Sequence, residues 1–514
     1  MNNNFLFKHF HYIFVLIFSI ILITYLSHYI GLDRHWTAFY DQETILIYNA
    51  LLFNNGIPIE YTDHPGYFTI LFLSFIFKFL SLINILPVYK LSLLTNENFD
   101  QSFQNLIFFT RIYSSICISF FFLCVYILFN IFSKNKLLSF VLLLILISSP
   151  GTIFHIAQLR TELLAMLFFL ISFSFLKAFF SKIKSNKICY LLFFFVFLFF
   201  SLLNKMQIFF FIPLFLLPIL FCENEVYDFN ISKFKFIEFK YFPFLLFILI
   251  IYYIYISNHT LHPFPYLSLF VVIINIFCIN LIFYFIYKNR VKNLRINLIV
   301  LNSVFILVFI IVKSLLSLHP STSEIIFINL TRVMDMAQYI PDTPSTNEIS
   351  SLLTYLLSKL IINGLLVFKN IFFELNIYSV LILINIILTL HFRNRLGKRN
   401  MSFNLVCLLI SVLIIIINSL RSNGLLMPQY QIFSDIFLVL SFSNFIRFLK
   451  IQYFVILFII VFSVNFKKNL EYVNHEKKYH NRIEIFCKDT FFTTWNRKIN
   501  TDFYYNFCEK NSMK

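Results

Sequence analysis

Charge is what this sequence has least of. Asp, Glu, Lys and Arg together make up 13% of its 514 residues, whereas a soluble protein of this length carries about 25%. Hydrophobic residues make up 59%, and the mean hydropathy is +0.81. A chain with so few polar groups cannot cover a water-facing surface. The composition therefore excludes a soluble globular protein and predicts an integral membrane protein.

The sequence also lacks a long polar linker and an evident internal repeat, and we expect no cleavable leader. Apolar runs recur along almost its whole length, so we expect one membrane domain, residues 1–466, and a small polar tail, residues 467–514. The run from Phe10 to Ile30 is too long for a signal peptide, and no small-residue cleavage site follows it. It is expected to be an uncleaved first span. Without a repeat, a transporter built of inverted halves is disfavoured.

Lys and Arg are the more numerous charges, and they give a net charge of +17. They form no basic patch of the kind that binds nucleic acid. They fall instead in short clusters between apolar runs, which is the distribution that orients membrane proteins. We therefore expect no nucleic-acid partner, and we use these clusters to place the chain in the membrane.

A membrane span needs about 20 apolar residues, and thirteen runs qualify. They are residues 10–30, 105–132, 137–157, 162–180, 188–204, 206–222, 241–257, 266–287, 297–318, 375–391, 401–420, 430–446 and 452–466. The basic clusters between them all fall on one side, which the positive-inside rule places in the cytoplasm. The sequence thus predicts an all-α polytopic protein of the cytoplasmic (inner) membrane, with a cytoplasmic N-terminus and an extracytoplasmic C-terminus.

Two further apolar segments, residues 65–87 and 349–373, do not fit this count. Lys78 interrupts the first of them, and polar residues alternate with Leu and Ile in the second. We expect both to be helices that lie in the outer membrane interface, within two long outer loops, residues 31–104 and 319–374. Long loops on one side of a helical bundle favour a function at that face.

The first outer loop holds the most informative polar residues. Asp41 opens a helix-like segment that Gly56 ends, and Asp63-His64-Pro65 follows. The N-terminus of a helix stabilises a carboxylate through its dipole, so the position suits an ionised Asp41. It equally suits an N-capping acid on a surface helix.

An ionisable residue at the end of a span costs little, but one within the apolar region costs about 2.5–3.5 kcal/mol on insertion scales, so those that persist need a reason. Arg160 and Glu162 open an apolar helix, and Lys205 lies between two apolar runs. Two interpretations stay open for each. Arg160 and Glu162 mark the boundary between membrane and water or belong to a functional site. Lys205 extends its ammonium into water as a snorkelling side chain or binds a phosphate. Arg421 and Tyr430 lie in a later outer turn.

The order of these elements resembles the C-type (GT-C) superfamily of membrane glycosyltransferases. The resemblance is to the branch of the lipid A aminoarabinose transferases and the bacterial relatives of protein O-mannosyltransferases. It covers the first 220 residues or so well and the last spans weakly. Further matches, in order, are Thr110-Arg111, Ser149-Pro150, Glu162, Lys205 with Pro213 and Pro218, and Gln429-Tyr430. His64 and Gln429 depart from the family pattern, which has Lys and Arg at these places.

The resemblance implies inverting transfer of a sugar from a polyprenyl-phosphate donor to a glycan, lipid or protein acceptor at the outer face, with membrane lipid around the spans. Asp41 would be the general base, and Glu162 would orient the acceptor or pair with Arg160. The implied substrate-binding residues are Asp63, His64, Arg160, Lys205, Arg421 and Tyr430. No cofactor is implied with certainty, and because no His–Glu–His set can be identified, a role for a divalent metal stays open.

Two other functions fit many spans and long outer loops. A polysaccharide polymerase or ligase tends to concentrate its chemistry in a late outer loop, whereas here the first loop is richer in polar groups. A lipid-linked sugar flippase or other transporter needs polar residues deep along a path through the spans, whereas here they gather at the outer ends. The sequence favours the glycosyltransferase over both.

Two of the eight cysteines, Cys487 and Cys508, lie in the polar tail. Outside the membrane they are able to form a disulfide, although the sequence does not show that they meet. The other six lie in or beside apolar runs, where we expect them to be packed as core residues.

Overall fold

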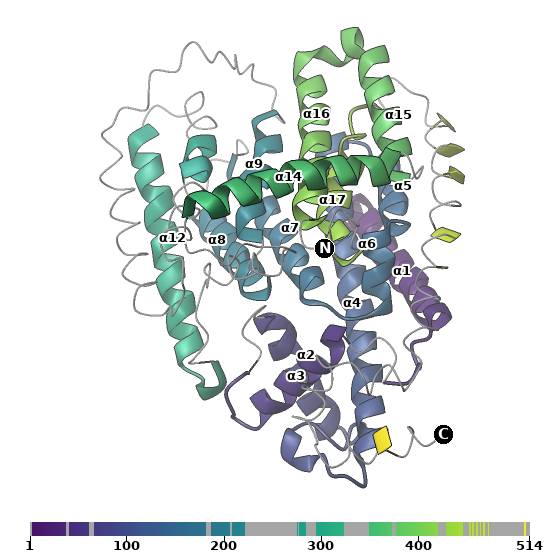
Figure 1. The fold of residues 1–514 in the computed structure, drawn as a ribbon, viewed down its shortest axis with the longest axis vertical. Coiled ribbons are helices and arrows are strands. Elements are labelled where there is room, and N and C mark those ends of the chain that lie inside the picture. Colours follow the sequence, from purple (N-terminus) through teal and green to yellow (C-terminus); the bar gives the residue numbers. More distant parts are fainter. Residues whose placement is uncertain are drawn as a thin grey trace. The chain divides into compact units, whose positions relative to one another are not determined.

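The computed structural model describes most of the expected membrane domain. The described residues are 3–36, 41–60, 66–180, 187–205, 208–221, 275, 277–283, 294–322, 349–372, 377–419 and 428–445, with scattered positions from 452 to 509. All secondary structure in these ranges is helical (Figure 1), which confirms the all-α class. The chain divides into two compact units. They are Met1–Lys205 with Val308–Ile325 and Pro428–Lys514, and Met206–Leu307 with Ile326–Met427.

Five helices in the described ranges are long and apolar enough to cross a membrane. They are α1 (Asn3–Ile30), α4 (Phe99–Ser133), α7 (Thr161–Phe180), α12 (Leu294–Ser317) and α16 (Arg393–Asn418). Each coincides with one of the expected runs, so the protein is a helical membrane protein. Four shorter helices also fall on expected runs: α8 (Lys187–Asn204), α9 (Ile208–Phe221), α15 (Ile377–His391) and α17 (Pro428–Leu440). The run 241–257 and most of 266–287 lie outside the described residues, and 452–466 is described only at scattered positions.

The expected span 137–157 is apolar enough to cross a membrane only as a bent pair of helices, so a single crossing there stays a prediction. It consists of α5 (Lys136–Ile147) and α6 (Pro150–Ala157), whose axes differ by 70°. Ser149 caps α6 by accepting the Thr152 backbone N–H, and Pro150 occupies the first turn. Proline is favourable there but has no N–H with which to continue α5. Hydropathy continues across the bend, which is why the run looked like one span.

Within the first unit, α4 packs against α1, α5 and α7, and α8 forms a hairpin with α7. Two buried serines fasten this hairpin, because the Ser172 hydroxyl donates to the Phe194 carbonyl at 2.8 Å and Ser201 to the Ala165 carbonyl at 2.6 Å. Serine hydroxyls that bond a carbonyl of a neighbouring helix stabilise close helix packing in an apolar environment. The hairpin thereby holds the end of α8 beside the start of α7.

In the first outer loop, α2 (Asp41–Asn54) begins at Asp41, as expected. The chain leaves it at Gly56, whose φ of 73° lies in the left-handed region that favours glycine. The expected interfacial segment 65–87 forms α3 (Tyr67–Leu82). With 16 residues this helix is about 24 Å long, which is shorter than the hydrocarbon core of about 30 Å.

In the second unit, α14 (Ile349–Phe372) runs across α15 and α16 (Figure 1), over the segment expected to lie in the interface. Its buried residues Asn363, Val367 and Ile371 recur every four positions, and therefore share one face. Another face of the helix leaves large apolar side chains exposed, and these are Leu357, Ile361, Leu365 and Phe368. A helix that crosses its neighbours and exposes an apolar face fits an interfacial position.

Helix α6 lies so close to α17 that only glycine fits at position 151. A Cβ built on Gly151 would overlap the backbone nitrogen of Ile432, whereas one on Gly364 in α14 would meet only the Ile416 Cδ1 atom at 3.9 Å. We expect Gly151→Ala to lower the free energy of unfolding by about 1–3 kcal/mol, since the two backbones must separate. Thermal unfolding in detergent measures this. Gly364→Ala is the matched control and is expected to be neutral or slightly stabilising.

Cys117 and Cys407 are buried, as expected, and Cys124 and Cys278 are partly buried, whereas Cys189 is exposed in the first turn of α8, so the expectation of a packed core residue is wrong there. Cys117, Cys124, Cys189, Cys278 and Cys407 are free thiols. Cys508 is disulfide-bonded. Cys487 and Cys222 lie outside the described residues, so the pairing of Cys487 with Cys508 stays a prediction.

Candidate functional site

Three separate stretches of the first unit deliver the predicted polar residues to one place. An extended link of three residues joins α6 to α7 and carries Arg160, and Glu162 follows in the first turn of α7. Lys205 comes directly after α8, which the serine bonds hold against α7. Tyr430 lies in the first turn of α17. We call Arg160, Glu162, Lys205 and Tyr430 the Glu162 cluster.

The carboxylate of Glu162 is the centre of this cluster. The Lys205 ammonium lies 2.8 Å from Glu162 Oε1, and the Arg160 Nε atom lies 3.4 Å from Glu162 Oε2. The Lys205 ammonium also lies 5.5 Å from the centre of the Tyr430 ring, within the range of a cation–π interaction. The guanidinium carbon of Arg160 lies 5.8 Å from the centre of the Phe154 ring. Two cations therefore share one carboxylate, and each lies against an aromatic ring.

The burial of these charges disfavours two of the interpretations that the sequence left open. Lys205 and Glu162 are 0% exposed and Arg160 is 3% exposed. A snorkelling lysine extends its ammonium into water, and a boundary marker is hydrated, so neither interpretation fits. Burying a charge costs several kcal/mol unless it is paired, and each of these charges is paired within the cluster.

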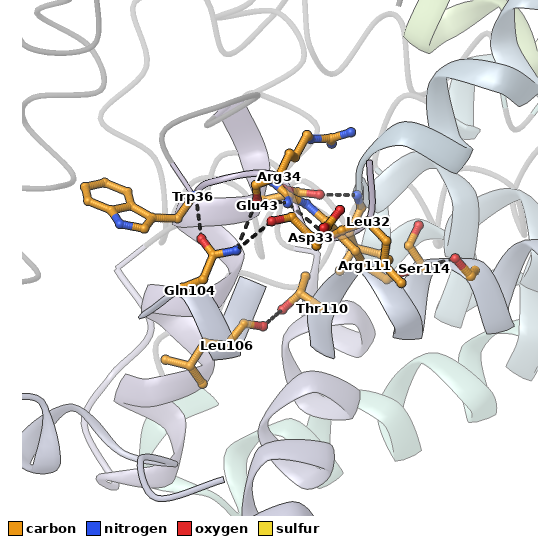
Figure 2. A network of polar contacts seen from close by, with 12 residues as sticks. Leu32, Asp33, Arg34, Trp36, Glu43, Gln104, Leu106, Thr110, Arg111 and Ser114 are labelled. Carbon is orange, nitrogen blue, oxygen red and sulfur yellow. Dashed lines mark hydrogen bonds and ion pairs between the residues drawn. The ribbon is translucent and has the colours of Figure 1, made fainter. Parts of the chain in front are cut away.

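A second buried ion pair joins Arg111 to Glu43 (Figure 2). Arg111, in the apolar helix α4, places its Nε atom 3.2 Å from Glu43 Oε2. The other oxygen of Glu43 accepts the backbone N–H of Leu159 at 3.1 Å. Leu159 directly precedes Arg160, so Glu43 ties the first turn of α2 to the segment that carries the Glu162 cluster.

The same arginine fastens the segment that follows α1. Arg111 Nη1 donates to the carbonyl of Arg34 at 2.6 Å and to that of Leu32 at 3.3 Å. Gln104 bonds this segment as well, through the Trp36 N–H and the Asp33 and Arg34 carbonyls (Figure 2). Burial and the neighbouring positive charge of Arg111 lower the pKa of Arg34 to about 9, whereas the negative charge of Glu43 acts to raise it. Arg34 is thus still charged at neutral pH.

Sequence reasoning did not select Glu43, Arg111 or His155 as site residues. Arg111 was noted only as a match to the family pattern, although an arginine inside an apolar helix needs a buried acidic partner. Glu43 follows Asp41 by two residues in the same helical turn. His155 is 0% exposed, and its Nδ1 atom lies 2.7 Å from the Gly151 carbonyl oxygen. Nothing in the local sequence distinguishes this histidine from one on an apolar face.

The side chains of the remaining predicted site residues are not described by the structure. Asp41 is the first residue of α2, and its side chain is not described. Asp63, His64 and Arg421 lie outside the described residues. In the ranges that the structure describes, no group of three or more His, Cys, Asp and Glu side chains is arranged to hold a metal ion. The question of a divalent metal therefore stays open.

We expect the Glu43–Arg111 pair to make a large contribution to the free energy of unfolding. Glu43→Ala removes the counter-charge nearest to a buried guanidinium and the acceptor of the Leu159 N–H. We expect it to lower the free energy of unfolding by about 3–5 kcal/mol, measured by thermal unfolding in detergent. The control is Glu97→Ala, because Glu97 is exposed. This substitution is expected to change the free energy of unfolding by less than about 0.5 kcal/mol. Equal stability of the two variants would contradict a structural role for the pair.

Fold and site together define a helical membrane protein with two linked, buried ion-pair networks. Comparisons of the chain with protein-family models, with curated proteins and with solved structures give no match.

Proposed function

We propose that this protein is a membrane glycosyltransferase of the GT-C type. It moves a sugar from a polyprenyl-phosphate donor to an acceptor at the outer face of the membrane, with inversion at the anomeric carbon. One observation carries the proposal. Arg160, Glu162, Lys205 and Tyr430 were each singled out from the sequence, and they meet in one buried cluster although up to 270 residues separate them along the chain.

The cluster has the chemistry that a lipid phosphate needs. An ammonium has three donors, and the contact with one oxygen of Glu162 leaves Lys205 able to bond a phosphate oxygen as well. Charge-assisted hydrogen bonds of this kind are about twice as strong as neutral ones, and burial strengthens them further. Because its two oxygens meet Lys205 and Arg160, Glu162 positions both cations. We therefore assign Glu162 the role of holding Lys205 and Arg160 in place, and not that of orienting the acceptor.

Asp41 is the general base in this proposal. It takes the proton from the acceptor hydroxyl as that oxygen attacks the anomeric carbon, and the bond from that carbon to the phosphate oxygen breaks. The bond from Glu43 to Leu159 supports a position near the phosphate, because it ties the first turn of α2 to the residue before Arg160. Asp63, His64 and Arg421 complete the proposed donor site.

The proposed topology has thirteen spans, with the N-terminus in the cytoplasm and the C-terminus outside. Five described helices support the spans, and the position of α14 across α15 and α16 supports an interfacial helix in the loop 319–374. The Glu162 cluster then lies at the outer ends of α7 and α8. Lys177, in the last turn of α7, lies at the opposite, cytoplasmic end.

The test of the proposal is a transfer assay on the purified protein in lipid nanodiscs. It is incubated with a panel of undecaprenyl-phosphate sugars, and release of undecaprenyl phosphate is followed by mass spectrometry. We expect release from at least one sugar of the panel and none from a Lys205→Met variant. Equal release from both proteins, or binding of the panel no tighter than that of a neutral polyprenol, would overturn the proposal.

A further inference from the structure

His155 lies beside the Glu162 cluster and has no part in the mechanism above. Its position is well defined, because the Ser114 hydroxyl of α4 donates to the His155 carbonyl at 3.1 Å and Nδ1 of the ring lies 2.7 Å from the Gly151 carbonyl oxygen. A carbonyl oxygen only accepts, so Nδ1 carries the proton. In the neutral ring this leaves Nε2 as a hydrogen-bond acceptor.

That acceptor is unused among the described residues. Nε2 of His155 is buried and has no hydrogen-bond partner, and the same holds for Oε1 of Gln158, three residues further on. A buried acceptor without a donor costs about 1–3 kcal/mol. Two buried acceptors without donors, one in the last turn of α6 and one in the residue that follows the helix, favour a ligand that brings its own donors.

The charges near His155 indicate what else that ligand carries. Glu162, Arg160 and Lys205 all lie within electrostatic range of the ring, and the two cations favour an anionic group. A ligand that satisfies both features has a phosphate within a few ångströms of hydroxyl groups. A sugar bonded to a phosphate through its anomeric carbon has this arrangement.

We infer that His155 Nε2 accepts a hydrogen bond from a hydroxyl of the transferred sugar and so selects sugar-bearing lipid phosphates over bare ones. The inference rests on the proposed function, since it takes the phosphate to lie at Lys205 and Arg160. His155 is then a specificity-determining residue. A site built to bond a substrate hydroxyl rejects analogues without it far more strongly than an apolar pocket does, because its own buried acceptor is left unpaired.

Two substitutions separate the hydrogen bond from the packing of the ring. In His155→Asn the amide takes the place of Nδ1 and keeps a donor for the Gly151 carbonyl, but nothing replaces Nε2. In His155→Gln the amide reaches the Nε2 position and supplies an acceptor there. Both variants keep a polar side chain of similar size, so a difference between them reports the acceptor at the ε position.

The experiment measures binding to the full-length protein in nanodiscs, with undecaprenyl phosphate as one probe and the undecaprenyl-phosphate glucose, mannose and galactose lipids as the others. We expect the wild type and His155→Gln to prefer at least one sugar lipid over bare undecaprenyl phosphate. We expect His155→Asn to lose about 10-fold of that preference and to bind the bare lipid as the wild type does.

Three results would overturn the inference: an unchanged preference in His155→Asn, an equal loss in both variants, or equal weakening for sugar-bearing and bare lipid. The last two would show that the ring serves packing alone. Failure of the proposed function looks different. In that case the wild type and Lys205→Met bind bare undecaprenyl phosphate equally, whatever stands at position 155.

Discussion

A Lys205→Met variant is expected to bind undecaprenyl phosphate about 10–100-fold more weakly than the wild type. The ammonium of Lys205 is the cation closest to Glu162, at 2.8 Å, and it is fully buried. Methionine keeps most of the volume of the side chain and removes the charge. The loss of one charge-assisted hydrogen bond corresponds to about 1.5–3 kcal/mol, which gives the stated range. Lipid binding in nanodiscs is the measurement.

The same substitution also breaks a buried ion pair, so its effect on folding must be separated from its effect on binding. Breaking such a pair destabilises by about 3–5 kcal/mol when the partner is left charged. In Lys205→Gln the neutral amide keeps a hydrogen-bond donor near Glu162, whose charge stays paired with Arg160, and we expect much of the stability to return while binding stays weak. If binding returned together with stability, the ammonium would serve the fold and not the phosphate.

Lys177 is the matched control for this experiment. It lies on the same helix as Glu162, about 22 Å along the axis, and places its ammonium 4.7 Å from the centre of the Phe132 ring. Lys177→Met makes the same change of side chain at a partly buried lysine at the opposite end of α7. We expect it to leave the binding of undecaprenyl phosphate unchanged.

Asp41→Asn is expected to reduce sugar transfer by about 10²–10⁴-fold, the range that general-base catalysis contributes, while leaving donor binding and thermal stability unchanged. Asparagine keeps the shape of the side chain and can still cap α2, but it does not accept a proton. The measurement is the rate of sugar transfer at saturating donor, beside the binding and unfolding experiments on the same preparation.

The control for Asp41 is Asp33→Asn, an exposed carboxylate of the same outer loop, which is expected to transfer sugar at the wild-type rate. Normal transfer by Asp41→Asn would remove this residue from the mechanism. A variant that instead unfolds early would show that the carboxylate serves as the N-cap of α2, which is the other role that the sequence allowed.

The positions of the helices were predictable to within a few residues because hydropathy and helix boundaries are local properties. The span expected at 162–180 is α7, and the helix expected to open at Asp41 and end before Gly56 is α2. The break at Ser149-Pro150 was visible as a motif, but the angle of 70° depends on how α6 packs against α17. No sequence window contains that packing.

The candidate site was predictable only in part. Arg160, Glu162, Lys205 and Tyr430 stood out because polar residues in apolar surroundings need a reason. Their pairing was not predictable, since Lys205 lies 43 positions from Glu162 and the sequence equally allowed it to reach into water. Glu43 and His155 were missed, because their importance comes from a contact with Leu159 and from an unsatisfied atom next to the cluster.

The sequence by itself determined that this protein lies in a membrane, that it is helical, and that its polar residues gather near the ends of its helices. These follow from composition and from runs of side chains, which act over about 20 neighbouring residues. Only the tertiary structure decided that Lys205 and Arg160 share the carboxylate of Glu162, and that Glu43 joins α2 to them. Ion pairs form between side chains a few ångströms apart in space, and chain separation places no limit on which residues folding brings that close.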